Sequence, residues 1–206
     1  SMNRYAEAET LLTGIIEADA AAGREDWNLL FARGACREAL DRWPEAEADL
    51  KAALALQPQN ASVLNYLGYS YVDRGVKLEE GLDLIRTALT YDPGSGFITD
   101  SLGWAYYRLG RYELATYFLE KAVELEPGDP TLNDHLGDAY WRAGRKLEAK
   151  YQWERSLKLD PAEQERARIE VKLLKGPDAP VLVQAESEPP PPNRPSPRRR
   201  PQPSPR

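Results

Sequence analysis

The chain has 206 residues and a formal net charge of −6, with 27 basic and 33 acidic side chains. One cysteine, Cys36, excludes an internal disulfide framework and a cysteine-based zinc site, and one histidine, His135, excludes a histidine-rich metal site. No apolar run approaches the roughly 18 residues of a membrane span, and the first residues lack the apolar region of a signal peptide. Ser1 before Met2 has the form of a cloning remnant, so we expect a fragment of a longer protein.

The first expected element is a helix over residues 3–22. Its apolar side chains recur at helical spacing, which predicts one buried stripe. The members of the stripe are Tyr5, Ala8, Leu11, Leu12, Ile15 and Ile16. We interpret residues 1–26 as the second helix of a partial repeat that precedes the four units described next.

A short block of sequence recurs along the middle of the chain. Leu67-Gly68-Tyr69-Ser70-Tyr71 is followed 35 residues later by Leu102-Gly103-Trp104-Ala105-Tyr106, and 34 residues later by Leu136-Gly137-Asp138-Ala139-Tyr140. A period of about 34 residues is typical of stacked helix–turn–helix units. Four units follow, over residues 27–60, 61–95, 96–129 and 130–163, each with a proline near its end.

Two kinds of residue recur inside these units: residues that end a helix, and small residues that let two helices approach closely. Gly75, Gly110 and Gly144 fit helix ends that need positive φ, and the segment that begins at Asp41 takes that place in the first unit. Small residues such as Gly103 recur where two helices must approach closely. The second unit has one extra residue near Lys77, which we expect in its turn.

These features resemble the tetratricopeptide repeat family over about residues 27–163. The matching residues are Leu-Gly, an aromatic side chain three residues after the glycine, then alanines and proline at the family's spacing. The resemblance implies an all-α fold, a right-handed solenoid of helix pairs. Residues 164–176 are expected to be a polar C-terminal capping helix.

The amino-acid sequence of the blocks around Asn65, Asp100 and Asp134 also resembles the C-terminal half of long bacterial repeat proteins, mainly proteobacterial. Members of that group are often exported, some as outer-membrane lipoproteins, and a relative is an adaptor for a periplasmic C-terminal processing protease. The resemblance implies a periplasmic or outer-membrane-peripheral location, with the cytoplasm as the alternative.

The last part of the chain, residues 177–206, is rich in proline and arginine. Residues 189–206 carry five arginines and no acid, a charge of +5, which leaves −11 on residues 1–188. We expect this tail to be disordered with polyproline II bias. It could bind proline-recognising domains or an anionic surface. A solvated spacer without a specific partner is the favoured interpretation.

No arrangement in the sequence predicts catalysis, a cofactor or a bound metal. Gly94-Ser95-Gly96 lacks the residues of a phosphate-binding loop. Asp134 and Asp138 share a helix face, but binding or solvation explains them better than acid–base chemistry. His135 is expected to pack or hydrogen-bond between adjacent helices, and Cys36 to be a buried small apolar residue. The chain is therefore not expected to be an enzyme.

The first helix of each unit is expected to line a concave face. In the first unit, the residues at the positions of this helix that face the concave side are Asn28, Phe31, Ala35 and Glu38. Aromatic, arginine and carboxylate side chains on this face indicate a surface for an extended peptide or a partner's helix. The predicted contact residues are Asn65, Tyr69, Asp73, Asp100, Trp104, Tyr107, Arg108, Asp134, Asp138, Trp141 and Arg142. Some of these rings, Trp104 above all, could instead pack against the neighbouring repeat.

The expected function is a non-catalytic scaffold or adaptor for a protein or peptide partner. The alternative is a docking or spacing region within a larger enzyme or envelope assembly. The carboxylate clamp that binds chaperone tails is not expected, because its positions hold Phe31, Ala35, Tyr66, Phe97 and Ser101. Nucleic acid is not expected as a partner, since the repeats are acidic.

Overall fold

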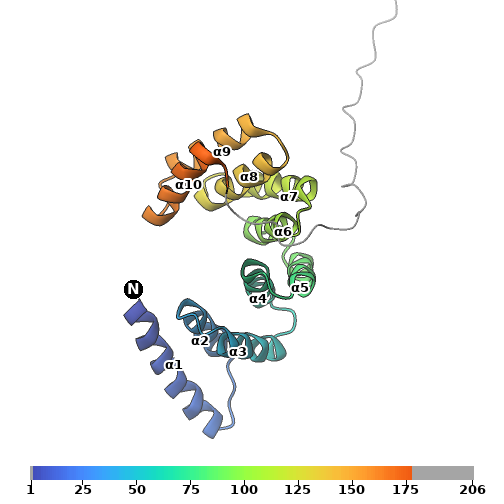
Figure 1. Cartoon of the computed structure of the whole chain (residues 1–206). Coiled ribbons are helices and arrows are strands. Elements are labelled where there is room, and N and C mark those ends of the chain that lie inside the picture. Colours follow the sequence, from blue (N-terminus) through green and yellow to red (C-terminus); the bar gives the residue numbers. More distant parts are fainter. Residues whose placement is uncertain (1, 178–206) are drawn as a thin grey trace, which may run out of the picture.

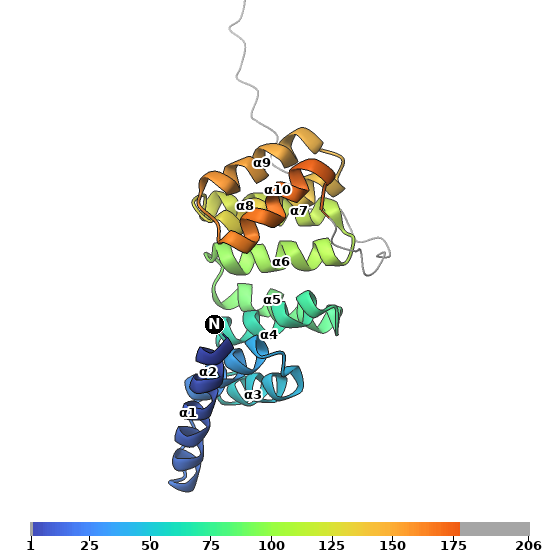
Figure 2. The ribbon, with the colours of Figure 1, turned by 60° about the vertical axis from the view of Figure 1, so that its left-hand side comes forward.

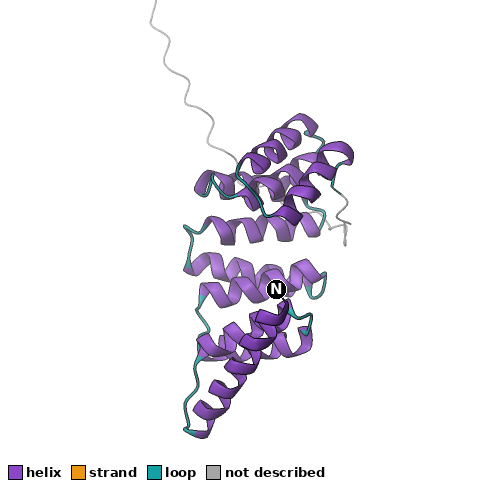
Figure 3. Ribbon diagram, turned by 90° about the vertical axis from the view of Figure 1, so that its left-hand side faces the viewer, coloured by secondary structure: helices purple, strands orange, loops and turns teal. Residues whose placement is uncertain are grey.

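The computed structural model describes residues 2–177, and the predicted disorder of the Pro/Arg-rich tail falls on residues outside that range. The described residues form ten helices and no strand (Figure 3). The helices are α1 (Met2–Ala21), α2 (Trp27–Ala39), α3 (Trp43–Leu56), α4 (Ala61–Arg74), α5 (Leu78–Tyr91), α6 (Gly96–Arg108), α7 (Tyr112–Leu125), α8 (Pro130–Arg142), α9 (Lys146–Lys158) and α10 (Glu163–Lys175). None of these helices is both long and apolar enough to cross a membrane.

The helices stack as antiparallel pairs in a curved right-handed array. The pairs α2–α3, α4–α5, α6–α7 and α8–α9 follow one another from the α1 end to the α10 end (Figures 1 and 2). The first helix of a pair lies toward the inside of the curve and the second toward the outside, as α4 and α5 show in Figure 1. The inner face is therefore built from α2, α4, α6 and α8.

Each inner helix begins with a residue that caps its free backbone amides. Asp26, Asn60, Ser95 and Asp129 recur at the repeat period, and the side-chain oxygen of each accepts a hydrogen bond from an amide of the first turn. Such caps contribute about 0.5–2 kcal/mol each. They fix where every inner helix starts, and so keep the inner residues in register from one unit to the next.

The turn inside each pair uses a left-handed residue. Gly75, Gly110 and Gly144 have φ of 69°, 75° and 82°, as their positions in the sequence predicted, and Asp41 has φ of 57° in the first unit. The extra residue of the second unit lies in the turn, where Lys77 has φ of 48° and directly precedes α5. The insertion therefore leaves both helices of that pair intact.

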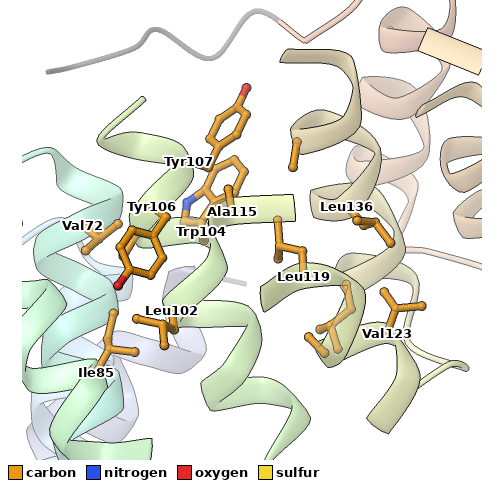
Figure 4. Close-up of a cluster of buried hydrophobic side chains, with 14 of the residues drawn as sticks. Val72, Ile85, Leu102, Trp104, Tyr106, Tyr107, Ala115, Leu119, Val123 and Leu136 are labelled. Carbon is orange, nitrogen blue, oxygen red and sulfur yellow. The ribbon is translucent and has the colours of Figure 1, made fainter. Parts of the chain in front are cut away.

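The main core runs through the interfaces from α4 to α10 (Figure 4). Gly103 on α6 faces Leu119 on α7 so closely that a Cβ atom on it would lie 2.6 Å from Leu119 Cγ. A smaller cluster of Leu50, Leu67 and Tyr71 joins α3 to α4. The small residues thus let the helices of a pair approach, as the sequence predicted.

Both ends of the array leave apolar side chains exposed. On α1, Ala8, Leu12 and Ile16 are half-buried, but Leu11 is 67% exposed and Ile15 39%. The predicted stripe is too wide, because α1 packs on α2 along one side only. On α10, Ile169 is buried and Leu174 is 83% exposed.

Candidate functional site

The inner face has a closed half and an open half. In the closed half, Asp100 on α6 bonds His135 on α8, with Nδ1 at 2.9 and 3.1 Å from the two carboxylate oxygens. The indole of Trp104 stacks on both Tyr107 and His135, at centroid distances of 4.6 and 4.3 Å. Figure 4 shows Tyr107 beside Trp104 on the same side of α6. These contacts join one inner helix to the next.

Lys172 makes the corresponding connection from α10 to α8. Its ammonium group donates to Asp134 at 2.7 and 2.8 Å and to Asp138 at 2.8 Å. Asp138 also accepts a hydrogen bond from the indole N–H of Trp153, at 3.0 Å. Burial raises the pKa of the Asp138 carboxyl to about 6, although Lys172 lowers it. The capping helix is thus held by a buried charge cluster.

The chain crosses the same face after α10. Gly176 has φ of 83° and lies against the indole of Trp141, where a Cβ atom would come within 2.5 Å of the ring. Arg142 donates to the carbonyl of Pro177 at 3.1 Å. The last described residues therefore cover Trp141 and Arg142, two of the predicted contact residues.

The open half is a cavity of about 670 Å³ between α1, α2 and α4. Arg108 on α6 lies near its edge and donates to the backbone carbonyl of Asp73 at 2.8 Å. Ten residues line the cavity: Tyr5, Ala35, Cys36, Glu38, Ala39, Tyr66, Tyr69, Ser70, Asp73 and Arg74. We call this cavity the tyrosine groove.

The tyrosine groove combines aromatic walls with a few charged groups. Glu38 accepts hydrogen bonds from Ser70 at 3.0 Å and from Arg74 at 3.4 Å. Burial raises the pKa of the Tyr69 phenol, and the carboxylates of Asp73 and Asp100 add to the rise. The groove can therefore offer neutral phenol rings beside carboxylates, a surface suited to apolar and cationic groups of a ligand.

The predicted contact residues fall into three groups. Four are at most 7% exposed and support the fold instead of facing a partner: Asp100, Trp104, Tyr107 and Asp138. Five are half-buried or bonded to a neighbouring helix or to the chain after α10: Asn65, Arg108, Asp134, Trp141 and Arg142. Tyr69 and Asp73 line the tyrosine groove.

In the first group, Tyr107, predicted as a contact residue, is only 2% exposed. The register placed these residues on the inner side of their helices, but adjacent inner helices lie close enough for such side chains to meet. Trp104 packs against the neighbouring repeat, which was the alternative prediction for its ring. His135 on α8 hydrogen-bonds Asp100 on α6, as predicted for a contact between adjacent helices.

Several groove residues were not predicted as contacts. Tyr5 lies on α1, whose packing angle on α2 no local pattern reveals. Cys36, predicted to be buried, is half-buried and lines the groove. Ala35 and Glu38 were placed on the inner face by register and line the groove. Within residues 2–177, no cluster of three His, Cys, Asp or Glu side chains is arranged to hold a metal ion.

The Asp100–His135 pair predicts a pH dependence of stability. Burial lowers the pKa of His135, but the charge and hydrogen bond of Asp100 outweigh it and raise the pKa from 6.5 to about 9. The stabilisation is fully present below about pH 6.5 and is lost as pH rises through about 9. We expect the free energy of unfolding to fall by at least about 1 kcal/mol between pH 6.5 and 9.5. Urea titrations check this, and a His135→Gln variant without a smaller slope would contradict it.

Comparison with known proteins identifies the class that this geometry defines. One tetratricopeptide repeat model matches residues 100–129, and another matches residues 1–61 and 37–96. Helix pairs of this period, stacked with glycines at the pair contacts, define a helical-repeat protein. The chain belongs to the tetratricopeptide repeat family, whose members are generally non-catalytic scaffolds that bind proteins.

Two curated relatives are bacterial. A TPR repeat-containing protein of Pseudomonas aeruginosa is 37% identical over 100 residues, which are 48% of this chain and 17% of that protein. The lipoprotein NlpI homolog of Haemophilus influenzae is 34% identical over 116 residues, 55% of this chain and 37% of that protein. The matched region is thus only a minor part of either relative.

Solved structures share the fold. A thermophilic TPR protein of Thermus thermophilus superposes with a TM-score of 0.71 at 23% identity, covering 84% of this chain and 92% of that one. A crystal structure of MamA gives a TM-score of 0.61 at 20% identity, covering 79% of this chain and 91% of that one. At these identities the likeness shows the solenoid fold alone.

Proposed function

We propose that the chain is an adaptor that holds a peptide or helix of a protein partner in the tyrosine groove. The observation that carries the proposal is the cavity of about 670 Å³ on the inner side of α2 and α4. Elsewhere on the inner face, at α6 and α8, side chains and the chain after α10 occupy the space. The open half is therefore where a partner can enter without displacing core residues.

The lining residues have the character of a contact surface. Aromatic side chains supply most of the energy in many protein interfaces, especially where a rim excludes water. Tyr5, Tyr66 and Tyr69 line the groove, and the side chain of Asp73 is 57% exposed. The adaptor role also draws on the likeness to the Haemophilus lipoprotein homolog.

A photo-crosslinking amino acid tests the location of the partner. It would replace Tyr5 in the groove, 45% exposed, and in a matched control Tyr151 on the outer helix α9, 61% exposed. We expect a partner adduct from the Tyr5 position and none from the Tyr151 position. Equal adducts, or adducts from Tyr151 alone, would place the partner outside the groove.

Binding measurements on the captured partner then test the side chains. We expect Tyr5→Ala and Asp73→Lys each to weaken binding at least about fivefold, the equivalent of 1 kcal/mol. Tyr151→Ala serves as the control and should leave the Kd unchanged. Circular dichroism and thermal melts verify that all three variants stay folded. If the two groove variants bind as tightly as the natural chain, the groove is not the binding site.

A second candidate function is docking within a larger assembly. It is favoured by α1, on which Leu11 and Ile15, one helical turn apart, are exposed apolar side chains. Adjacent exposed apolar side chains often mark contacts with another protein. Crosslinks that map to Leu11 and bypass Tyr5 would favour this second function over the first.

A further inference from the structure

The side chains of the tyrosine groove are complementary to the prolines and arginines of residues 189–206 of the same chain. Tyrosine faces accept proline rings in polyproline II segments, and they also attract arginine guanidinium groups. Residues 189–206 combine closely spaced prolines with Arg194, Arg198, Arg199, Arg200 and Arg206. Glu38 and Asp73 bring carboxylates to the same groove.

We propose that residues 189–206 dock in the tyrosine groove of the same molecule and compete there with the external partner. The proposal rests on the proposed function, because it names an internal ligand for the same site. Docking would place proline rings against Tyr5, Tyr66 and Tyr69, with arginines near Asp73 and Glu38.

The charges of the two parts favour this occupant. Residues 189–206 carry +5 without any acid, and residues 1–188 carry −11. In the groove, Glu38 pairs with Arg74 and Asp73 pairs with Arg108, and Asp73 keeps 57% of its side chain exposed to a further cation. Opposite net charges increase the local concentration of the segment at the groove, in a way that salt screens.

The point where the described chain ends makes the contact reachable. Gly176 and Pro177 lie on the inner face against Trp141 and Arg142 of α8, so the chain leaves α10 on the side of the groove. The eleven residues 178–188 span about 35 Å at roughly 3.1 Å per residue. Packed helices lie about 8–10 Å apart, so two steps along the inner face, from α8 to α4, cover about 20 Å.

The consequence is a threshold for partner binding. A tethered segment reaches an effective concentration in the millimolar range, so even weak docking fills the groove when no partner is present. A partner must then bind more tightly than the segment, or be present in excess. Variants that lack the arginines should bind the partner more tightly than the natural chain does.

Cys36 provides the test, since it lines the groove and is the only cysteine of the chain. Its alkylation by iodoacetamide at pH 8 would be followed by mass spectrometry in the natural full-length chain and in a variant with all five tail arginines changed to glutamine. We expect alkylation at least about threefold slower in the natural chain at low salt, with the difference lost at 1 M NaCl. Alkylation in 6 M guanidinium chloride gives the matched intrinsic rate, which should be equal in both chains.

Three further arms complete the test. Asp73→Lys in the natural chain should raise the alkylation rate toward that of the arginine variant. A synthetic peptide of residues 189–206, added at millimolar concentration to the arginine variant, should restore protection. The rate in the natural chain should not change over a tenfold range of protein concentration.

Equal alkylation rates in the two chains at low salt would overturn the proposal. Protection that grows with protein concentration would overturn its intramolecular form, because the segment would then come from a second copy. Neither result affects the crosslinking at the Tyr5 position, so failure of the internal ligand and failure of the partner groove can be told apart.

Discussion

Changing Lys172 to methionine is expected to lower the free energy of unfolding by about 3–5 kcal/mol at pH 7.5, the usual cost of removing one partner from a buried ion pair. Lys172 bonds both Asp134 and Asp138, and Asp138 is 1% exposed. Methionine fills a similar volume, so the loss reports the uncompensated carboxylates and not a cavity. Chemical denaturation measures it, and Lys150→Met on the exposed side of α9 is the matched control.

The size of this loss should depend on pH. The pKa of Asp138 is raised to about 6 in the folded protein, above its ordinary value of 3.8. A carboxyl with a raised pKa destabilises the fold when it ionises, so stability is lost as pH rises from about 4 through 6. Without Lys172 this carboxyl should stay protonated to higher pH, and the deficit of the variant should shrink at pH 5. A deficit that is the same at pH 5 and 7.5 would mean that Lys172 acts through packing alone.

Gly103→Leu is expected to destabilise the protein by about 2–3 kcal/mol, because extra atoms at a close helix contact force the helices apart. A Cβ atom at this position would lie 2.6 Å from Leu119 Cγ and 3.1 Å from the Leu119 backbone nitrogen. The side chain of Leu119 is fully buried, so it has no free space into which to move. Thermal and urea unfolding measure the effect.

Gly94→Leu is the matched control for Gly103→Leu. Gly94 lies in the exposed turn before α6, where a Cβ atom would meet nothing within 4 Å. We expect a change of less than about 0.5 kcal/mol there, as for most exposed positions. Equal destabilisation by the two substitutions would show that the loss does not come from the α6–α7 contact.

The arrangement of the inner face within residues 2–177 explains where the tyrosine groove lies. From α6 to α10, the polar and aromatic side chains of each inner helix meet those of the next, as Asp100 meets His135. Between α2 and α4, Glu38 accepts hydrogen bonds from Ser70 and Arg74, and the small side chains of Ala35 and Ala39 line the cavity that remains. The tyrosine groove therefore lies toward the α1 end of the array.

The repeat architecture could be predicted from the sequence because its determinants are local and recur. The 34-residue period, the glycines of the turns and the small residues at pair contacts each act within one unit. Gly75, Gly110 and Gly144 need no distant neighbour to favour left-handed turns. Even the insertion near Lys77 was placed in its turn, because the flanking positions keep their register.

The side chains that are open to a partner were decided only by the tertiary structure. Register shows that Asp100, Trp104, Tyr107 and Asp138 point inward, but their burial depends on how closely α6, α8 and α10 approach one another. The packing of α1 on α2 likewise brings Tyr5 and Cys36, 31 positions apart in the chain, to the lining of the same groove. Helix periodicity determines the direction of a side chain, whereas exposure depends on the distance between whole helices, which the sum of many packing contacts determines.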